Sequence, residues 1–345
     1  MYSHQYFFRW KGSAIPAALP NALLVTVIAA VITILYELTN IKLSIDSDFI
    51  NVIGLVLSFL LAYRVTAAYE KYGEGFNQWT SLMASIRCMS TLIVWVNVDE
   101  NDENDILEKK TALKLLLAFA VAMKHHVREE MGTHYVDIVD LIPSTMKIEQ
   151  PMNEIRHGYE REPPSDYTTF MSISLYLSNY FKKIANRKKA DENIISVLND
   201  NLVKIIDCFT NIEKVTKNAQ PLSYSIFISQ TVWIYCLALP FQLVANSGWV
   251  SIPLIFFMAF ILFCAHRIGS EIENPFGYDL NDLDLDQSCS DIKKELDILS
   301  SFQCPKFEDI VNYQNKRSGA IPDDVISNLS VKDRKNDVPI EISET

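Results

Sequence analysis

Four long apolar runs divide the chain, and charged or polar connectors separate them. They cover residues 19 to 38, 49 to 69, 222 to 245 and 249 to 268. A helix needs about 20 consecutive apolar residues to cross a bilayer. The second run reaches that length only by continuing from Tyr63 to Tyr69. The pattern therefore predicts four transmembrane helices, arranged as two hairpins.

Basic residues flank one end of these runs. They precede the first run, follow the second and end the fourth: Arg9, Lys11, Arg64, Lys71 and Arg267. The connector at 245 to 250 has no Lys or Arg, and the connector at 37 to 48 has only Lys42. Cytosolic flanks of membrane helices are enriched in Lys and Arg. The sequence thus predicts a multi-pass integral membrane protein with both termini in the cytosol, without indicating which membrane.

The long middle segment between the second and third runs contains no further span. Residues 112 to 127 are apolar but carry Lys114 and Lys124, which suits a buried core helix better than a span. Residues 192 to 215 show apolar positions at helical spacing, and residues 99 to 105 are predicted to form a solvated acidic loop. No segment alternates as a strand does, so we expect an all-α membrane protein with a helical cytosolic domain.

These patterns divide the chain into six parts. The predicted parts are a cytosolic N-terminus (1–18), transmembrane helices 1 and 2 (19–69), a cytosolic helical domain (70–221), transmembrane helices 3 and 4 (222–268), a cytosolic C-terminal helical segment (269–315) and a tail (316–345). The tail is polar and lacks aromatic residues, which is typical of a disordered segment.

Composition and motifs disfavour several functions. A net charge of −11 without a basic stripe argues against a nucleic-acid partner. The chain has no CxxC pair, no phosphate-binding glycine motif and no Ser–His–Asp grouping. His125 and His126 point about 100° apart on a helix, so we expect a hydrogen-bonded core or interface pair rather than a metal site. We therefore expect no enzymatic activity and no required cofactor.

Bulky side chains recur at every fourth position of the second run. Leu55, Phe59 and Tyr63 form one helix stripe with steps of about 6 Å along the axis. Gly54, Ser58 and Ala62 lie one position earlier, and small residues let neighbouring helices approach closely. The spacing alone leaves two interpretations open: the stripe lines a pore, or it packs against other helices or lipid.

Several motifs, in order along residues 9 to about 300, resemble those of the bestrophin channels. They are "RWKGS", "LLAYR", "GEGFNQW", "FAVAMKHHVREE", "NAQPLSY" and "IENPFGYDLNDLDLD". The chain is more similar to the compact bacterial and fungal members than to the animal ones. The resemblance implies a homopentamer in membrane lipid, with four spans per subunit around one central pore that passes mainly anions such as chloride.

The resemblance also implies roles for particular residues. Leu55, Phe59 and Tyr63 match the family's neck, three apolar rings that gate by dewetting and widening. Tyr63 stands where the family more often has Phe, and its hydroxyl could hydrate the lower ring. Ile194 matches a second constriction, the cytosolic aperture, with Ile195 as an equal alternative at the same helix start. Plain core packing of that helix stays open as well.

The acidic segment after the fourth run resembles the calcium clasp of animal relatives. The matching positions are Glu271, Asn274, Asp279 and Asp282. Calcium needs six to eight oxygen ligands, and the clasp also uses an N-terminal segment that is short here. Bacterial-like members keep "NPFG" as a fold element, so a structural turn is the favoured interpretation and calcium the alternative.

Three functions follow from these patterns. The first, implied by the resemblance, is an anion channel gated at the neck. The second is a cation-selective channel of the same fold, because acidic vestibules concentrate cations. The third is a non-conducting membrane scaffold. A secondary carrier is disfavoured because the four runs show no internal repeat.

Overall fold

The computed structural model describes residues 10–39, 47–96, 102–130, 137, 141, 165–217, 221–301 and 310–314. The long regular elements in these ranges are all α-helices. The helices are α1 (Ile15–Thr39), α2 (Ser47–Trp95), α3 (Glu103–Val127), α5 (Ser165–Asn186), α6 (Glu192–Lys217), α7 (Leu222–Ser247), α8 (Ser251–Glu271) and α9 (Leu285–Ser301), with the short 3₁₀ helix η2 (Gly248–Val250) between α7 and α8.

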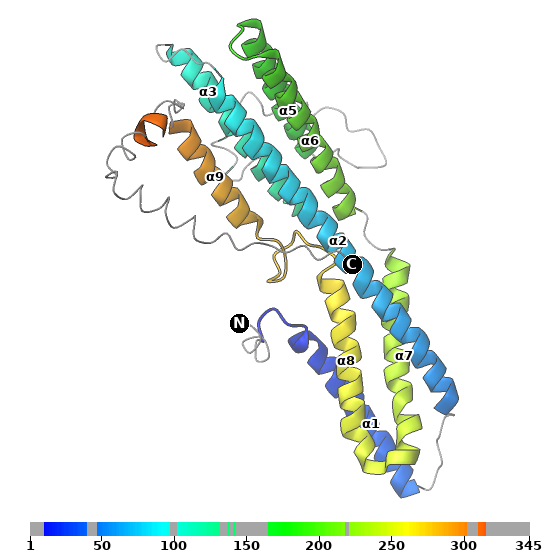
Figure 1. Cartoon of the computed structure of the whole chain (residues 1–345). Coiled ribbons are helices and arrows are strands. Elements are labelled where there is room, and N and C mark those ends of the chain that lie inside the picture. Colours follow the sequence, from blue (N-terminus) through cyan, green and yellow to red (C-terminus); the bar gives the residue numbers. More distant parts are fainter. Residues whose placement is uncertain are drawn as a thin grey trace, which may run out of the picture.

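The chain forms two helical bundles that share one long helix (Figure 1). The apolar bundle contains α1, α7, α8 and the first half of α2, and the polar bundle contains α3, α5, α6, α9 and the second half of α2. At 1.5 Å per residue, the 49 residues of α2 extend for about 74 Å. The predicted boundary between residues 69 and 70 therefore falls inside a continuous helix, and the boundary at 268 falls inside α8.

Three stretches of the described chain are long and apolar enough to cross a membrane: Ile15–Thr39, Asp48–Trp95 and Ser223–Glu271. The third stretch turns back on itself at η2, so that α7 and α8 form an antiparallel hairpin (Figure 1). Gly248 has φ +50° at this turn, a conformation that glycine adopts without steric cost. Small buried residues on α1, Ala18, Ala22 and Ala29, let it pack closely in the apolar bundle.

The predicted core helix at 112 to 127 is confirmed as the centre of the polar bundle. Almost all of α3 from Ala112 onward is buried, including Phe119 and Met123. The predicted amphipathic helix at 192 to 215 is confirmed as α6, and it buries one face at helical spacing: Leu198, Leu202, Ile205, Cys208, Ile212 and Val215.

The prediction of an acidic loop over residues 99 to 105 is wrong at its end. Residues 97–101 lie outside the described chain, but Glu103 to Asp105 form the first turn of α3. Asp102 is the N-cap, and its carboxylate accepts a hydrogen bond from the Asn104 amide at 3.0 Å. Acidic side chains favour this position because a helix N-terminus carries partial positive charge. Asp105 is also only 4% exposed, because Arg187 and Lys189 pair with it.

Candidate pore-lining helix and adjoining sites

One face of α2 carries a row of exposed apolar side chains. Leu55, Phe59 and Tyr63 are 59%, 69% and 66% exposed, whereas Leu57 and Leu61 on the opposite face are buried in the apolar bundle. The helix places the three exposed residues one above another, as the spacing of four predicts. They do not contribute to the subunit's own core and are free to contact something outside it.

The row changes character along the helix. Val52 extends its apolar part toward the start of α2, and Val56 lies beside Leu55. Beyond Tyr63 the exposed positions on this face become polar, with Thr66, Glu70 and Asn77 at helical spacing. The same face of one helix thus passes from apolar to hydrophilic about where the apolar bundle ends.

The small residues beside the row have different surroundings. A Cβ at Gly54 would lie 2.7 Å from the hydroxyl oxygen of Tyr235, so glycine at this position lets α7 pack closely against α2. The Ser58 hydroxyl donates to the Leu55 carbonyl at 2.7 Å, and Ser58 and Ala62 are exposed. Gly54 therefore serves packing inside the subunit, and the other two face outward.

Arg64, which follows Tyr63 directly, faces into the subunit. It is 3% exposed and donates to His266 Nδ1 at 3.0 Å and to Ser270 Oγ at 2.9 Å, both on α8. In the sequence, Arg64 ends the "LLAYR" motif and helps to orient the membrane helices, but no separate role was predicted for it. A charged residue at the end of an apolar run was the available signal.

The predicted aperture residues start α6. Ile194 and Ile195 are both half-buried and pack against the core of the polar bundle. Val197, less than one turn later, is 42% exposed. Within a single subunit the two isoleucines have similar surroundings, so the choice between them stays a prediction.

The adjacent histidines of α3 have separate roles. His125 is buried, and its Nε2 lies 3.0 Å from an oxygen of Asp137 while its Nδ1 pairs with Glu130. His126 packs its ring against Phe170 with a centroid distance of 5.5 Å. The interpretation of a hydrogen-bonded core position is confirmed for His125, and His126 belongs to an aromatic cluster.

The segment after α8 forms turns that use its own polar side chains. Asn274 Oδ1 accepts a hydrogen bond from the Phe276 amide at 3.3 Å, and the Asp282 carboxylate accepts from the Asp279 amide at 2.7 Å. Glu271 lies 3.8 Å from Arg267 on the preceding turn. Burial raises the pKa of the Asp282 carboxyl above its usual value. These bonds suit the structural-turn interpretation.

No group of three or more His, Cys, Asp or Glu side chains suited to a metal ion occurs in the described part of the chain. Asp286, the last acidic residue of the motif, is engaged by Lys124 at 3.0 Å and by Arg128 at 2.8 Å. The hydrogen bond from Arg128 lowers the pKa of the Asp286 carboxyl, and the Lys124 bond adds to the effect. Calcium binding at the four matched positions stays a prediction.

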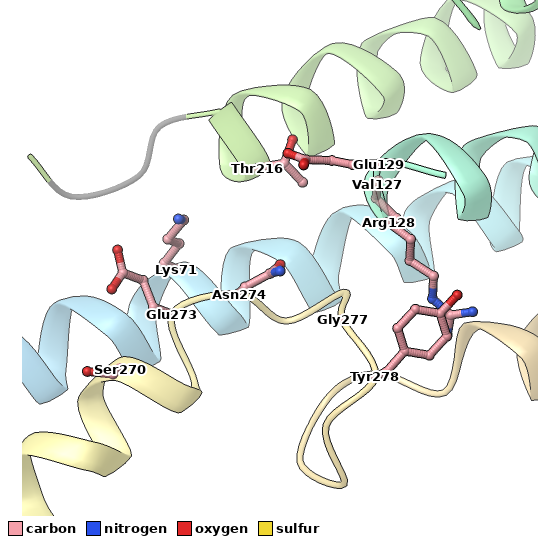
Figure 2. A pocket seen from close by; sticks show the side chains of 10 residues that line it. All are labelled: Lys71, Val127, Arg128, Glu129, Thr216, Ser270, Glu273, Asn274, Gly277 and Tyr278. Atoms are coloured by element: carbon pink, nitrogen blue, oxygen red, sulfur yellow. The ribbon is translucent and has the colours of Figure 1, made fainter. Parts of the chain in front are cut away.

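A cavity of about 390 Å³ lies between the two bundles, shown in Figure 2. Lys71 of α2 and Glu273 lie together on one side of it, and Glu129 and Tyr278 contribute to the other. Arg128 stacks over the Tyr278 ring at 4.2 Å. The cavity thus has a mixed lining of both charges.

The apolar helices and the exposed row of α2 define the class of the protein as an all-helical integral membrane protein. The chain belongs to the bestrophin family, because it matches the model described as bacterial/fungal bestrophin protein over residues 2–298.

Several similar proteins carry the name voltage-dependent anion channel-forming protein. One from Nostoc sp. is 31% identical over 86% of this chain and 91% of its own length. Another from Synechocystis sp. is 32% identical over 88% of this chain and 92% of its own length. A solved structure of a bacterial bestrophin homologue from Klebsiella pneumoniae superposes with a TM-score of 0.71 at 20% identity. It covers 85% of this chain and 100% of that one, which shows the shared fold.

Proposed function

We propose that the protein is an anion channel, a homopentamer gated at a hydrophobic neck of Leu55, Phe59 and Tyr63. The observation that carries the proposal is the exposed apolar row on α2, which the subunit's own core leaves unused. The bestrophin family membership and the names of the two relatives support anion permeation.

The physical case for a gate rests on the chemistry of the row. Five copies of α2 around an axis would bring five sets of these side chains together as three stacked rings. An apolar constriction of that kind expels water, and ions pass only when the ring widens or hydrates. The Tyr63 hydroxyl makes the lowest ring the most easily hydrated of the three.

The proposed topology has four crossings, formed by α1, the first half of α2, α7 and α8. A bilayer core is about 30 Å thick, so α2 is long enough to cross it and continue into the polar bundle. The start of α1 and the end of α8 lie at the same end of the apolar bundle, next to the polar bundle (Figure 1). This placement favours a cytosolic polar bundle with both chain termini on its side. Ile194, in the first turn of α6, is the residue proposed for its aperture.

A cation-selective channel of the same fold is the second candidate. Glu70 and Glu74 are exposed on α2 shortly beyond Tyr63, and the chain carries a net charge of −11. Negative charge along a conduit concentrates cations. Calcium modulation through Glu271, Asn274, Asp279 and Asp282 stays the alternative to a structural turn, and recording with and without calcium tests it.

The neck is tested by replacing Leu55, Phe59 and Tyr63 together with alanine and recording single channels in planar bilayers. We expect a larger conductance or open probability, because smaller side chains no longer expel water from the constriction. A matched control replaces Leu24, Val27 and Val31, which are similarly exposed on α1, with alanine. The control should conduct like the wild type. Equal effects of both triple variants, or no current from any of the proteins, would contradict the proposed gate.

A further inference from the structure

A buried positive charge lies directly behind the proposed neck. Arg64 is the residue after Tyr63, so its Cα lies about 1.5 Å farther along the axis of α2 and about 100° around it. Its side chain is 3% exposed and is enclosed between α2 and α8. Gly269 leaves room for it, since a Cβ at that position would lie 3.5 Å from Arg64 Cγ.

The hydrogen-bond partners of this guanidinium are neutral. Arginine can only donate, so His266 Nδ1 accepts from Nη1 at 3.0 Å and the Ser270 hydroxyl accepts from Nη2 at 2.9 Å. Its Nε is buried without a hydrogen-bond partner. Within the described chain no carboxylate lies within 4.0 Å of it, and Glu271 is paired with Arg267 instead. The charge of Arg64 is therefore not cancelled locally.

Burying an unpaired charge opposes folding, and ionisable residues at membrane depth commonly mark ion pathways. Lipid headgroups are unsuitable partners, because the side chain has almost no exposed surface. The exposed carboxylates of Glu70 and Glu74 on the same helix are screened by water and salt. Arg64 is shielded from that screening, so its field extends through protein of low dielectric constant toward the lower ring.

We infer that Arg64 determines the anion preference of the channel, as a fixed positive charge behind the Tyr63 ring that favours anions over cations. The inference rests on the proposed channel function. The guanidinium acts at a distance and does not touch the ion. Five copies around the pore axis would surround the lower neck with positive potential, which opposes the attraction of cations by the exposed Glu70 and Glu74 beyond it.

Reversal potentials under a KCl gradient test the inference through the chloride-to-potassium permeability ratio. Arg64→Gln should lower the ratio at least about tenfold, because a unit charge about 10 Å away acts oppositely on anions and cations. Arg64→Lys keeps the charge but loses the two-pronged hydrogen bond, so it should stay within about threefold of the wild type by the same electrostatic argument. The control is Arg87→Gln. Arg87 lies farther along α2 and pairs with Glu295 of α9, so this change should leave the permeability ratio unchanged.

A second pair of variants leaves Arg64 in place and covers the case in which Arg64→Gln fails to fold. Ser270→Asp places a carboxylate against the guanidinium, and Ser270→Asn is its neutral equivalent of the same size. The Asp variant should have a ratio at least about fivefold below that of the Asn variant, because a paired charge produces a much weaker field.

An unchanged ratio in Arg64→Gln, or equal ratios in the two Ser270 variants, would overturn the inference while the channel itself stands. If Arg64→Lys lost selectivity as fully as Arg64→Gln, the hydrogen bonds rather than the charge would be responsible, and the inference would fail. Absence of current from the wild type and the neck-alanine variant would instead refute the proposed function.

Discussion

Two glycines of α2, two residues apart, should respond to alanine in opposite directions. A Cβ at Gly75 would lie 2.9 Å from Pro275 Cγ and 3.0 Å from Phe276 Cζ. Phe276 is fully buried, and the Leu283 amide donates to the Pro275 carbonyl at 2.9 Å. The loop therefore cannot move away without disturbing the core. A Cβ at Gly73 would meet nothing within 4 Å.

The magnitudes follow from these surroundings. Alanine in place of glycine inside a helix gains about 1 kcal/mol of stability. Inserting a methyl group into a packed core costs about 1–3 kcal/mol. Gly73→Ala should therefore stabilise the protein by up to about 1 kcal/mol, and Gly75→Ala should be about 1–3 kcal/mol less stable than Gly73→Ala.

The assay is thermal unfolding of the purified protein in detergent, followed by intrinsic tryptophan fluorescence. Gly73→Ala serves as the control, since it adds the same methyl group to the same helix. We expect the Tm values to rank Gly73→Ala first, wild type second and Gly75→Ala last. A Gly75→Ala variant as stable as Gly73→Ala would refute the close packing of the loop at residues 274 to 277 against α2.

Three further changes test the polar bundle by the same unfolding measurement. Phe276→Ala should lose about 3–5 kcal/mol, since it empties a fully buried site; a loss below about 1 kcal/mol would contradict that burial. Asp105→Asn should lose about 1–3 kcal/mol, because the buried carboxylate that pairs with Arg187 at 2.9 Å and with Lys189 becomes neutral. Asp286→Asn should lose about 1 kcal/mol or less at pH 7, because the Asp286 side chain is 59% exposed and water screens its ion pairs. The hydrogen bond from Arg128 lowers the pKa of the Asp286 carboxyl below its unfolded value of about 3.9, so this stability is present above that pH and lost as pH falls through the lowered value. The loss of stability in Asp286→Asn should therefore become smaller below about pH 4. A loss that does not change with pH would contradict the pairing of Asp286 with Arg128.

The helical class and the long helices were predictable because apolar periodicity reports burial directly. The core role of residues 112 to 127 followed from Lys114 and Lys124, which exclude a span. Of these two, Lys114 is exposed, whereas Lys124 is buried and paired with Asp137 and Asp286. That pairing joins α3 to α9 across more than 150 residues of sequence, and no local pattern could have predicted it.

The misassigned residues Glu103 to Asp105 show a similar limit. Acidic composition predicted solvent exposure, but Asp105 is buried because Arg187 and Lys189 reach it from the connection between α5 and α6. The exposed row of Leu55, Phe59 and Tyr63 was predictable from spacing, and the surroundings of Arg64 were not. Its partners His266 and Ser270 lie about 200 residues away, and the fold alone brings them together.

The most direct test of the central claim is the reversal potential of the purified wild-type protein in planar bilayers under a KCl gradient. We predict a value close to the chloride equilibrium potential. A reversal near the potassium equilibrium potential would contradict anion permeation and favour the cation-selective alternative. No current from the wild type or from the neck-alanine variant would contradict the channel itself.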